Sequence, residues 1–406
     1  MDNPGDRPIR DGLAGRLSRR RALEAIAGGS VAAGLAAAMA RNGLAWDDAT
    51  PAASGSPAPG SPDGATPFNY RLGASAPQVF TGGTLRTATV ANIASLAGLS
   101  IILLDIDPGA LRELHWHPNA GEINYVLEGE GSIGILSATQ ETATFAIRPG
   151  SITYVPIGDA HYIRNTGPET LRLLVGFSNE AAQHFDMSNA LPWVPSDLLN
   201  QTLGVAPGTL PIFPPRGDLA VVPVSGEAEP ARDAATPFST HVDDLLLQKF
   251  AGGTVQPVRV DVLPKLTGMT LLKLDIDGGA LREPHWHGNA SEFNFCASGT
   301  AQIGIVAPTG ESWTFVVETG DVAYIPKNWF HYIASVDDEP LLFLAFFDNI
   351  APNRVDLSGM TAFFPPEVLA ASFGMDPEIF GSLPPRETVV IAAPLSPDDG
   401  DATPEG

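Results

Sequence analysis

The chain has 406 residues, of which 44% are hydrophobic and 17% charged, so it is long enough for two domains with packed cores. Its formal net charge of −23 argues against nucleic acid and anionic membranes as partners, because a field of that sign repels both. A single cysteine, Cys296, excludes an intrachain disulfide, and we expect it to be a small buried strand residue rather than a reactive thiol.

Residues 1–40 have the composition of an export signal. The run Ser18-Arg19-Arg20-Arg21 precedes an Ala- and Gly-rich apolar stretch, and Ala38-Met39-Ala40 offers a small-residue cleavage site. Paired arginines favour the twin-arginine route and so predict a periplasmic, cell-surface or extracellular protein. Two alternatives stay open: an ordinary N-terminal helix or, without cleavage, a membrane anchor.

Two further segments are too polar and too rich in Pro, Gly or acidic residues to bury an apolar face. Residues 41–65 are predicted to be a disordered linker, and residues 393–406 a disordered acidic tail.

Between these segments the sequence repeats itself. Thr66-Pro67-Phe68 recurs as Thr236-Pro237-Phe238, and residues 110–117 recur as residues 280–287. The offset is 170 residues each time, so the chain contains a duplicated domain rather than a solenoid of short repeats.

Each copy has the pattern of a β domain. Short apolar runs separated by Gly and Pro predict strands at 99–106, 122–127, 131–136 and 151–155. Many short strands at regular spacing predict an all-β sandwich or barrel. A helix is expected after each copy, at 366–374 and, with a weaker pattern, near 195–204.

Six of the eight histidines fall at matching positions in the two copies, each set with one glutamate. The sets are His115, His117, Glu122 and His161 in the first copy, and His285, His287, Glu292 and His331 in the second. Two histidines spaced by two on a strand point to one face, and the next strand returns the glutamate beside them. Imidazole and carboxylate without thiolate suit manganese, iron or zinc. His184 and His241 lie outside these sets and are expected to be surface or structural residues.

The spacing resembles the two motifs of the cupin family. Gly109, His115, His117, Glu122 and Gly129 match the first motif, and the second follows from Gly150 to Asn165. In the second copy, Asn328 replaces a motif glycine and Ser335 a motif asparagine, neither of them a ligand. The resemblance implies two tandem jelly-roll cupin barrels with short flanking helices, at 66–225 and 236–392, each holding one metal.

Within the cupins, the Arg-Glu-x-His-Trp-His pattern of both copies resembles the two-domain oxalate decarboxylases. That resemblance implies manganese at both sites, oxalate or a similar small carboxylate as substrate, dioxygen as a further partner, and trimers or hexamers. It also implies that Arg112 and Arg282 bind the substrate carboxylate. The alternative for each arginine is a surface ion pair, for instance with the adjacent Glu113 or Glu283.

The proton donor is where the sequence departs from that family. The family has a glutamate in a Ser-Glu-Asn-Ser stretch, whereas this chain has Ser178-Asn179-Glu180-Ala181. Glu180 is the candidate general acid, displaced by about one residue, and its alternative is a solvated loop residue. Without a placed acid, two other functions stay open: an oxalate oxidase that produces hydrogen peroxide, or a non-catalytic exported metal-binding cupin.

Overall fold

A computed structural model of the protein describes residues 66–213, 220–226, 235–383 and 389–392. The predicted export signal, linker and acidic tail lie outside these residues. In the part of the chain that is described, no helix has both the length and the apolar character needed to cross a membrane.

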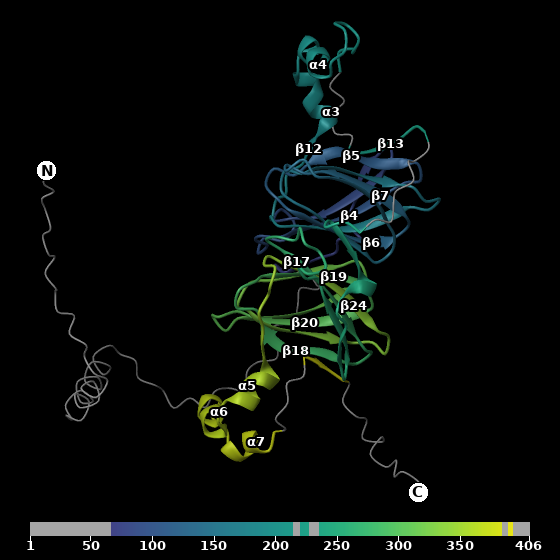
Figure 1. The fold of residues 1–406 in the computed structure, drawn as a ribbon. Coiled ribbons are helices and arrows are strands. Elements are labelled where there is room, and N and C mark those ends of the chain that lie inside the picture. The colour runs from purple at the N-terminus through teal and green to yellow at the C-terminus, as the bar shows by residue number, and fades with distance from the viewer. Residues whose placement is uncertain (1–65, 214–219, 227–234, 384–388, 393–406) are drawn as a thin grey trace, which may run out of the picture. The chain divides into compact units, whose positions relative to one another are not determined.

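The first sequence copy forms a barrel of two antiparallel sheets. Their orders are β14-β9-β6-β11-β4-β3-β2 and β12-β5-β10-β7-β8, with β13 added to β5. The strands are β2 (Gln78–Phe80), β3 (Gly83–Ala88), β4 (Ser100–Ile106), β5 (Ala110–Trp116), β6 (Glu122–Glu128), β7 (Gly131–Leu136), β8 (Thr142–Ile147), β9 (Ser151–Val155), β10 (Ala160–Asn165), β11 (Leu171–Phe177), β12 (Phe185–Asp186), β13 (Val221–Pro223) and β14 (Ser239–His241). The blue to teal strands of Figure 1 belong to this barrel.

The second copy repeats the arrangement, with sheet orders β1-β22-β19-β24-β17-β16-β15 and β21-β20-β23-β18-β25, and β26 added to β18. Its strands, green to yellow in Figure 1, are β15 (Gln248–Phe250), β16 (Gly253–Pro257), β17 (Thr270–Ile276), β18 (Leu281–Trp286), β19 (Glu292–Ser298), β20 (Thr300–Val306), β21 (Ser312–Glu318), β22 (Val322–Ile325), β23 (Phe330–Ser335), β24 (Leu341–Phe347), β25 (Val355–Asp356) and β26 (Val390–Ile391). The short strand β1 (Asn69–Tyr70), from the start of the first copy, joins them. The predicted all-β fold of two tandem jelly-roll barrels is therefore confirmed.

The start of each sequence copy pairs with the other barrel. Strand β1 pairs with β22, and β14 pairs with β9. The preceding phenylalanines follow the same exchange: Phe68 belongs to the core of the second barrel, and Phe238 to the core of the first. The duplicated sequence unit and the folded barrel thus differ by one short segment at each start.

Central strands of the larger sheets are buried on both faces, which explains their continuous apolar sequence. In β11, Leu173 and Val175 belong to the core of the first barrel, whereas Leu174 belongs to a cluster that draws residues from both barrels. A Cβ on Gly176 would lie 2.4 Å from the Phe346 ring, so this glycine permits the close approach of β11 and β24.

Short helices follow each barrel, as predicted. They are α3 (Met187–Ala190), η1 (Leu191–Trp193) and α4 (Ser196–Thr202) after the first, and α5 (Leu357–Phe363), α6 (Pro366–Phe373) and α7 (Pro377–Gly381) after the second. Gly374 ends α6 in the left-handed region, with φ of 65°, where glycine has no steric penalty.

Two expectations about single residues, Cys296 and His241, are also confirmed. Cys296 lies buried in β19, and burial raises the pKa of its thiol to about 12. The His241 Nε2 atom bonds the Pro149 carbonyl, and its Nδ1 caps the 3-10 helix η2 (Val242–Asp244), so its role is structural. At the substituted motif glycine, Asn328 adopts φ of 66°, close to the 82° of its counterpart Gly158, and asparagine tolerates this region.

Candidate metal centres

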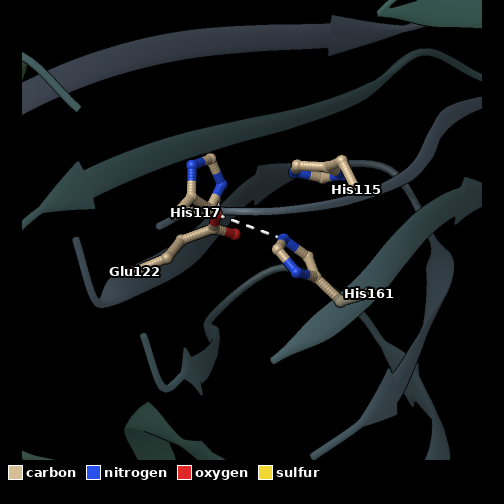
Figure 2. A group of neighbouring side chains, drawn as sticks. All are labelled: His115, His117, Glu122 and His161. Atoms are coloured by element: carbon tan, nitrogen blue, oxygen red, sulfur yellow. Dashed lines mark ion pairs between the residues drawn. The ribbon is translucent and has the colours of Figure 1, made fainter. Parts of the chain in front are cut away.

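The eight predicted ligands come together as two separate groups of four. In the first barrel, β5 carries His115, His117 follows its end, Glu122 begins β6, and β10 supplies His161. Strands β5 and β10 pair with His115 opposite His161, and β18 and β23 repeat this register with His285 opposite His331. Figure 2 shows the three imidazoles and the carboxylate of the first barrel turned toward one another.

Both groups are compact and buried. Within each group the candidate ligand atoms lie within 4.8 Å of one another. In the first barrel Glu122 Oε2 lies 2.8 Å from His117 Nε2 and 3.3 Å from His161 Nε2. In the second, the Nε2 atoms of His285 and His287 are 3.2 Å apart.

The backbone fixes which nitrogen of each imidazole faces inward. All six Nδ1 atoms lie within hydrogen-bond distance of a backbone carbonyl oxygen, at 2.6 to 3.1 Å. Because a carbonyl can only accept, each Nδ1–H donates and each Nε2 presents a lone pair. The carbonyls of Gln183 and Asn353 belong to the loops that follow β11 and β24, so these loops help orient His117 and His287.

The protonation states favour ligands that are ready for a cation. Burial lowers the pKa of His115 well below its usual value, with further lowering by Arg112 and by the neighbouring imidazoles. Burial alone would raise the pKa of Glu122, but its interactions with His161 and His117 together hold it well below the usual range. His285 and Glu292 shift in the same directions. Neutral imidazoles and an ionised carboxylate are the forms that bind metal.

This donor set fits a divalent transition metal. Three lone pairs converge on a carboxylate, and the buried His117 and His161 Nε2 atoms find no hydrogen-bond donor. Such an arrangement is repulsive unless a proton or a metal cation sits among the four groups. Nitrogen and oxygen ligands without sulfur suit manganese, and the two groups fit two manganese ions.

Each predicted arginine lies beside its metal centre, but its partner is not the adjacent glutamate. Arg112 Nη2 lies 2.8 Å from Asp186 Oδ1, and Arg282 Nη2 lies 2.7 Å from Asp356 Oδ1, with all four side chains buried. Each arginine is therefore in an ion pair, as the alternative expected, but the pair is buried rather than at the surface. Its carboxylate is not that of the adjacent Glu113 or Glu283, because neighbouring strand residues point to opposite faces. These glutamates accept hydrogen bonds from Ser188 and Ser358 instead.

Sequence reasoning missed the two aspartates. The signal was present, because Asp186 and Asp356 repeat at the 170-residue offset inside Asp-x-Ser. The aspartates also pair with the ligand strands, Asp186 opposite His115 and Asp356 opposite His285. The short strands β12 and β25 thus fix the orientation of both arginines.

Glu180 is engaged away from the four ligands. Its carboxylate accepts a hydrogen bond of 3.0 Å from the Gly98 amide, and its carbonyl accepts one from Val90. Hydrogen bonds with backbone amides lower the pKa of Glu180. A lower pKa disfavours the protonated carboxyl that a general acid needs.

A small cavity reaches the second centre. It has a volume of about 60 Å³ and is lined by His285, His287 and Glu292 together with Arg282, Arg354 and Phe347. Since a cavity needs roughly 10–15 Å³ to hold one water, this space suits a ligand of a few atoms.

Comparison with known proteins agrees with this geometry. The cupin family pattern matches twice, over residues 72–209 and 247–379. Oxalate decarboxylase OxdC of Bacillus subtilis strain 168 is 27% identical over 296 residues, which cover 70% of this chain and 76% of the relative. A probable oxalate decarboxylase of Arthroderma benhamiae is 23% identical over 348 residues, covering 82% and 85% of the two chains. Germin-like protein subfamily 2 member 2 of Arabidopsis thaliana is 31% identical over 145 residues, or 34% of this chain and 66% of the relative.

Solved structures share the fold over most of the chain. Oxalate decarboxylase from Bacillus subtilis at pH 4.6 superimposes with a TM-score of 0.73 at 23% identity, covering 80% of this chain and 88% of that one. Another structure of that enzyme, with the same TM-score of 0.73, belongs to a study of its Mn(II) centres. With two family matches, two barrels and two complete ligand sets, the chain belongs to the cupin family as a two-domain member resembling oxalate decarboxylase.

Proposed function

We propose that the protein is a manganese-dependent enzyme that converts oxalate and one proton into formate and carbon dioxide. The observation that carries the proposal is a buried arginine beside each buried centre, Arg112 in one barrel and Arg282 in the other. A small dianion in a site with little water needs such a cation, and a planar guanidinium suits a carboxylate. The likeness to relatives named oxalate decarboxylase extends over both barrels and supports the proposal.

The side chains would divide the work as follows. Three histidines and one glutamate hold each ion, which supplies Lewis-acid and one-electron redox chemistry when bound. Arg112 and Arg282 attract and orient the substrate carboxylate. Phe177 and Phe347 pack against ligand imidazoles, with ring centroids 4.8 and 5.0 Å apart, and limit water at the site.

An alternative product is favoured by one observation. The Glu180 carboxylate accepts a hydrogen bond from the Gly98 amide, and this contact does not hold it at the first centre as a proton donor. Without one, oxalate, dioxygen and two protons would give two carbon dioxide and one hydrogen peroxide, the reaction of an oxalate oxidase. Incubation of the manganese-loaded protein with oxalate and dioxygen at acid pH separates the functions. Formate supports the decarboxylase, peroxide supports the oxidase, and neither product supports a metal-binding protein without catalysis.

Glu180 remains our proposed general acid, and it would have to leave Gly98 to act. Glu180→Gln should then abolish formate production while two metals per chain remain bound. Glu169→Gln, at an exposed carboxylate in a turn of the same barrel, is the matched control. Formate production unchanged by Glu180→Gln would remove this residue from the mechanism.

Export by the twin-arginine route is also part of the proposal. The supporting feature is the arginine run before the apolar stretch near the N-terminus. Replacing Arg19, Arg20 and Arg21 with lysine should keep the protein inside the cell, as measured by fractionation. Secretion of the variant at the native level would contradict this route.

We further propose assembly into trimers or hexamers through the terminal helices. These helices expose large apolar side chains, including Trp193 at 87% and Phe363 at 80% of full exposure, which is costly in water. Light scattering should give a mass of three or six chains, and Trp193→Glu with Phe363→Glu should reduce it. A native monomer would contradict the assembly.

A further inference from the structure

The two centres differ in one charged residue. Arg354 directly precedes β25 in the second barrel, and the residue at the same place before β12 in the first barrel is His184. The flanking strands pair identically with their ligand strands, Asp186 opposite His115 and Asp356 opposite His285. The exchange of histidine for arginine therefore occurs at equivalent positions.

In the second barrel one carboxylate serves two guanidinium groups. Asp356 Oδ1 lies 2.7 Å from Arg282 Nη2, and its Oδ2 lies 2.7 Å from Arg354 Nε. In the first barrel Asp186 pairs with Arg112 at 2.8 Å. Among the described side chains, Asp186 thus has one guanidinium partner, whereas Asp356 has two. A second guanidinium next to a buried centre favours an anionic ligand there.

Arg354 also lines two hollows. It lines the cavity of about 60 Å³ that contains the ligands of the second centre. It lines as well an outer groove formed with Trp286, Asp356, Met360 and Phe363. The Arg354 side chain is 38% exposed, whereas that of Arg282 is 7% exposed. Arg354 is thus accessible to solvent, and Arg282 is the buried arginine beside the centre.

From this geometry we propose that Arg354 captures small dicarboxylates and makes the second centre the tighter anion-binding site of the two. Arg354 is thus a specificity-determining residue of the second barrel. In the first barrel, the equivalent His184 does not supply a permanent positive charge. The inference rests on the proposed function for its substrate class.

Calorimetric titration of the manganese-loaded full chain with oxalate, under nitrogen to prevent dioxygen-dependent turnover, tests it. We expect two classes of site. Arg354→Gln should weaken the tighter class by about 10- to 100-fold, the loss expected for one hydrogen bond to a charged group. Arg354→Lys should weaken it less, and the matched His184→Gln should change neither class by more than about threefold. His184→Arg should tighten the weaker class. Malonate serves as a second dianion, and two metals per chain must remain in each variant.

Unchanged binding in Arg354→Gln, an equal loss in His184→Gln, or no binding of either dianion by the native chain would overturn the inference. Formate and peroxide production are measured in a separate assay. If Arg354→Gln loses oxalate affinity but the native protein yields neither formate nor peroxide, the inference stands and the proposed reaction fails. If formate forms and Arg354→Gln binds oxalate as the native chain does, only the inference fails.

Discussion

The starting segment of each sequence copy packs in the other barrel, and this exchange predicts which barrel a mutation there destabilises. From the sequence repeat alone, one would expect the opposite barrel to be destabilised. Phe238 belongs to the second sequence copy, yet its side chain is 1% exposed within the core of the first barrel. Phe68 belongs to the first copy and is 3% exposed within the core of the second barrel. Phe238→Ala should therefore destabilise the first barrel, and Phe68→Ala the second.

The size of each effect follows from the burial. Truncating a buried phenylalanine to alanine costs about 3–5 kcal/mol, through lost apolar burial and the cavity left behind. Phe68 also contacts Trp313 and Trp329 at ring centroid distances of 4.9 and 5.4 Å. Such aromatic pairs add about 0.5–1.5 kcal/mol each, so Phe68→Ala should lie at the upper end of the range. A loss of this size is a large part of the 5–15 kcal/mol that stabilises a typical domain.

Hydrogen exchange followed by mass spectrometry resolves the two barrels separately. At 1.4 kcal/mol per factor of ten, amide protection should fall by roughly two to three orders of magnitude in the affected barrel. For Phe238→Ala the fall should appear in β6 and β11, and for Phe68→Ala in β19 and β24. Greater loss of protection in the barrel of the same sequence copy, or equal loss in both, would refute the exchange.

Three further predictions concern single groups. Asp186→Asn removes the charge partner of the buried Arg112, which should cost about 3 kcal/mol of folding free energy and lower the melting temperature. Arg112→Met combined with Asp186→Leu should recover part of this lost stability. An unchanged melting temperature in Asp186→Asn would contradict the buried pair. Cys296, with its thiol pKa raised to about 12, should not react with a thiol reagent at pH 8 until denaturant is added, and fast native labelling would show that it is accessible. Because the pKa of His115 is lowered in the folded chain, the unfolded chain binds more protons below about pH 6.5. The melting temperature of the metal-free protein should therefore fall between pH 7 and 5. The fall should be steeper with metal bound, because the cation keeps the ligand imidazoles unprotonated in the folded chain. A flat profile without metal would contradict this.

Much of the fold and of both ligand sets could be predicted from the sequence. The 170-residue offset sets the number of barrels, and the two-residue spacing of His115 and His117 follows from strand geometry. Strand β9 was predicted at 151–155, where the structure has it. Local sequence patterns were enough to predict these features, because each pattern occurs in both copies of the repeat.

What the sequence could not supply was long-range pairing. Thr66-Pro67-Phe68 and Thr236-Pro237-Phe238 are identical, so nothing local tells which barrel each segment joins. The partner of Arg112 lies 74 positions away, at Asp186, whereas the adjacent Glu113 offered a nearer but wrong choice. A contact between residues far apart in the chain depends on the folded topology, and it produces no periodic pattern in the sequence.

In each barrel, four buried side chains are placed to hold one cation. Elemental analysis of the purified protein should find two transition-metal ions per chain, with manganese as the native ion. His115→Ala combined with His117→Ala should leave one, and the matched His285→Ala with His287→Ala should also leave one. A native chain without stoichiometric metal, or variants that still bind two ions, would show that these side chains do not hold one cation in each barrel.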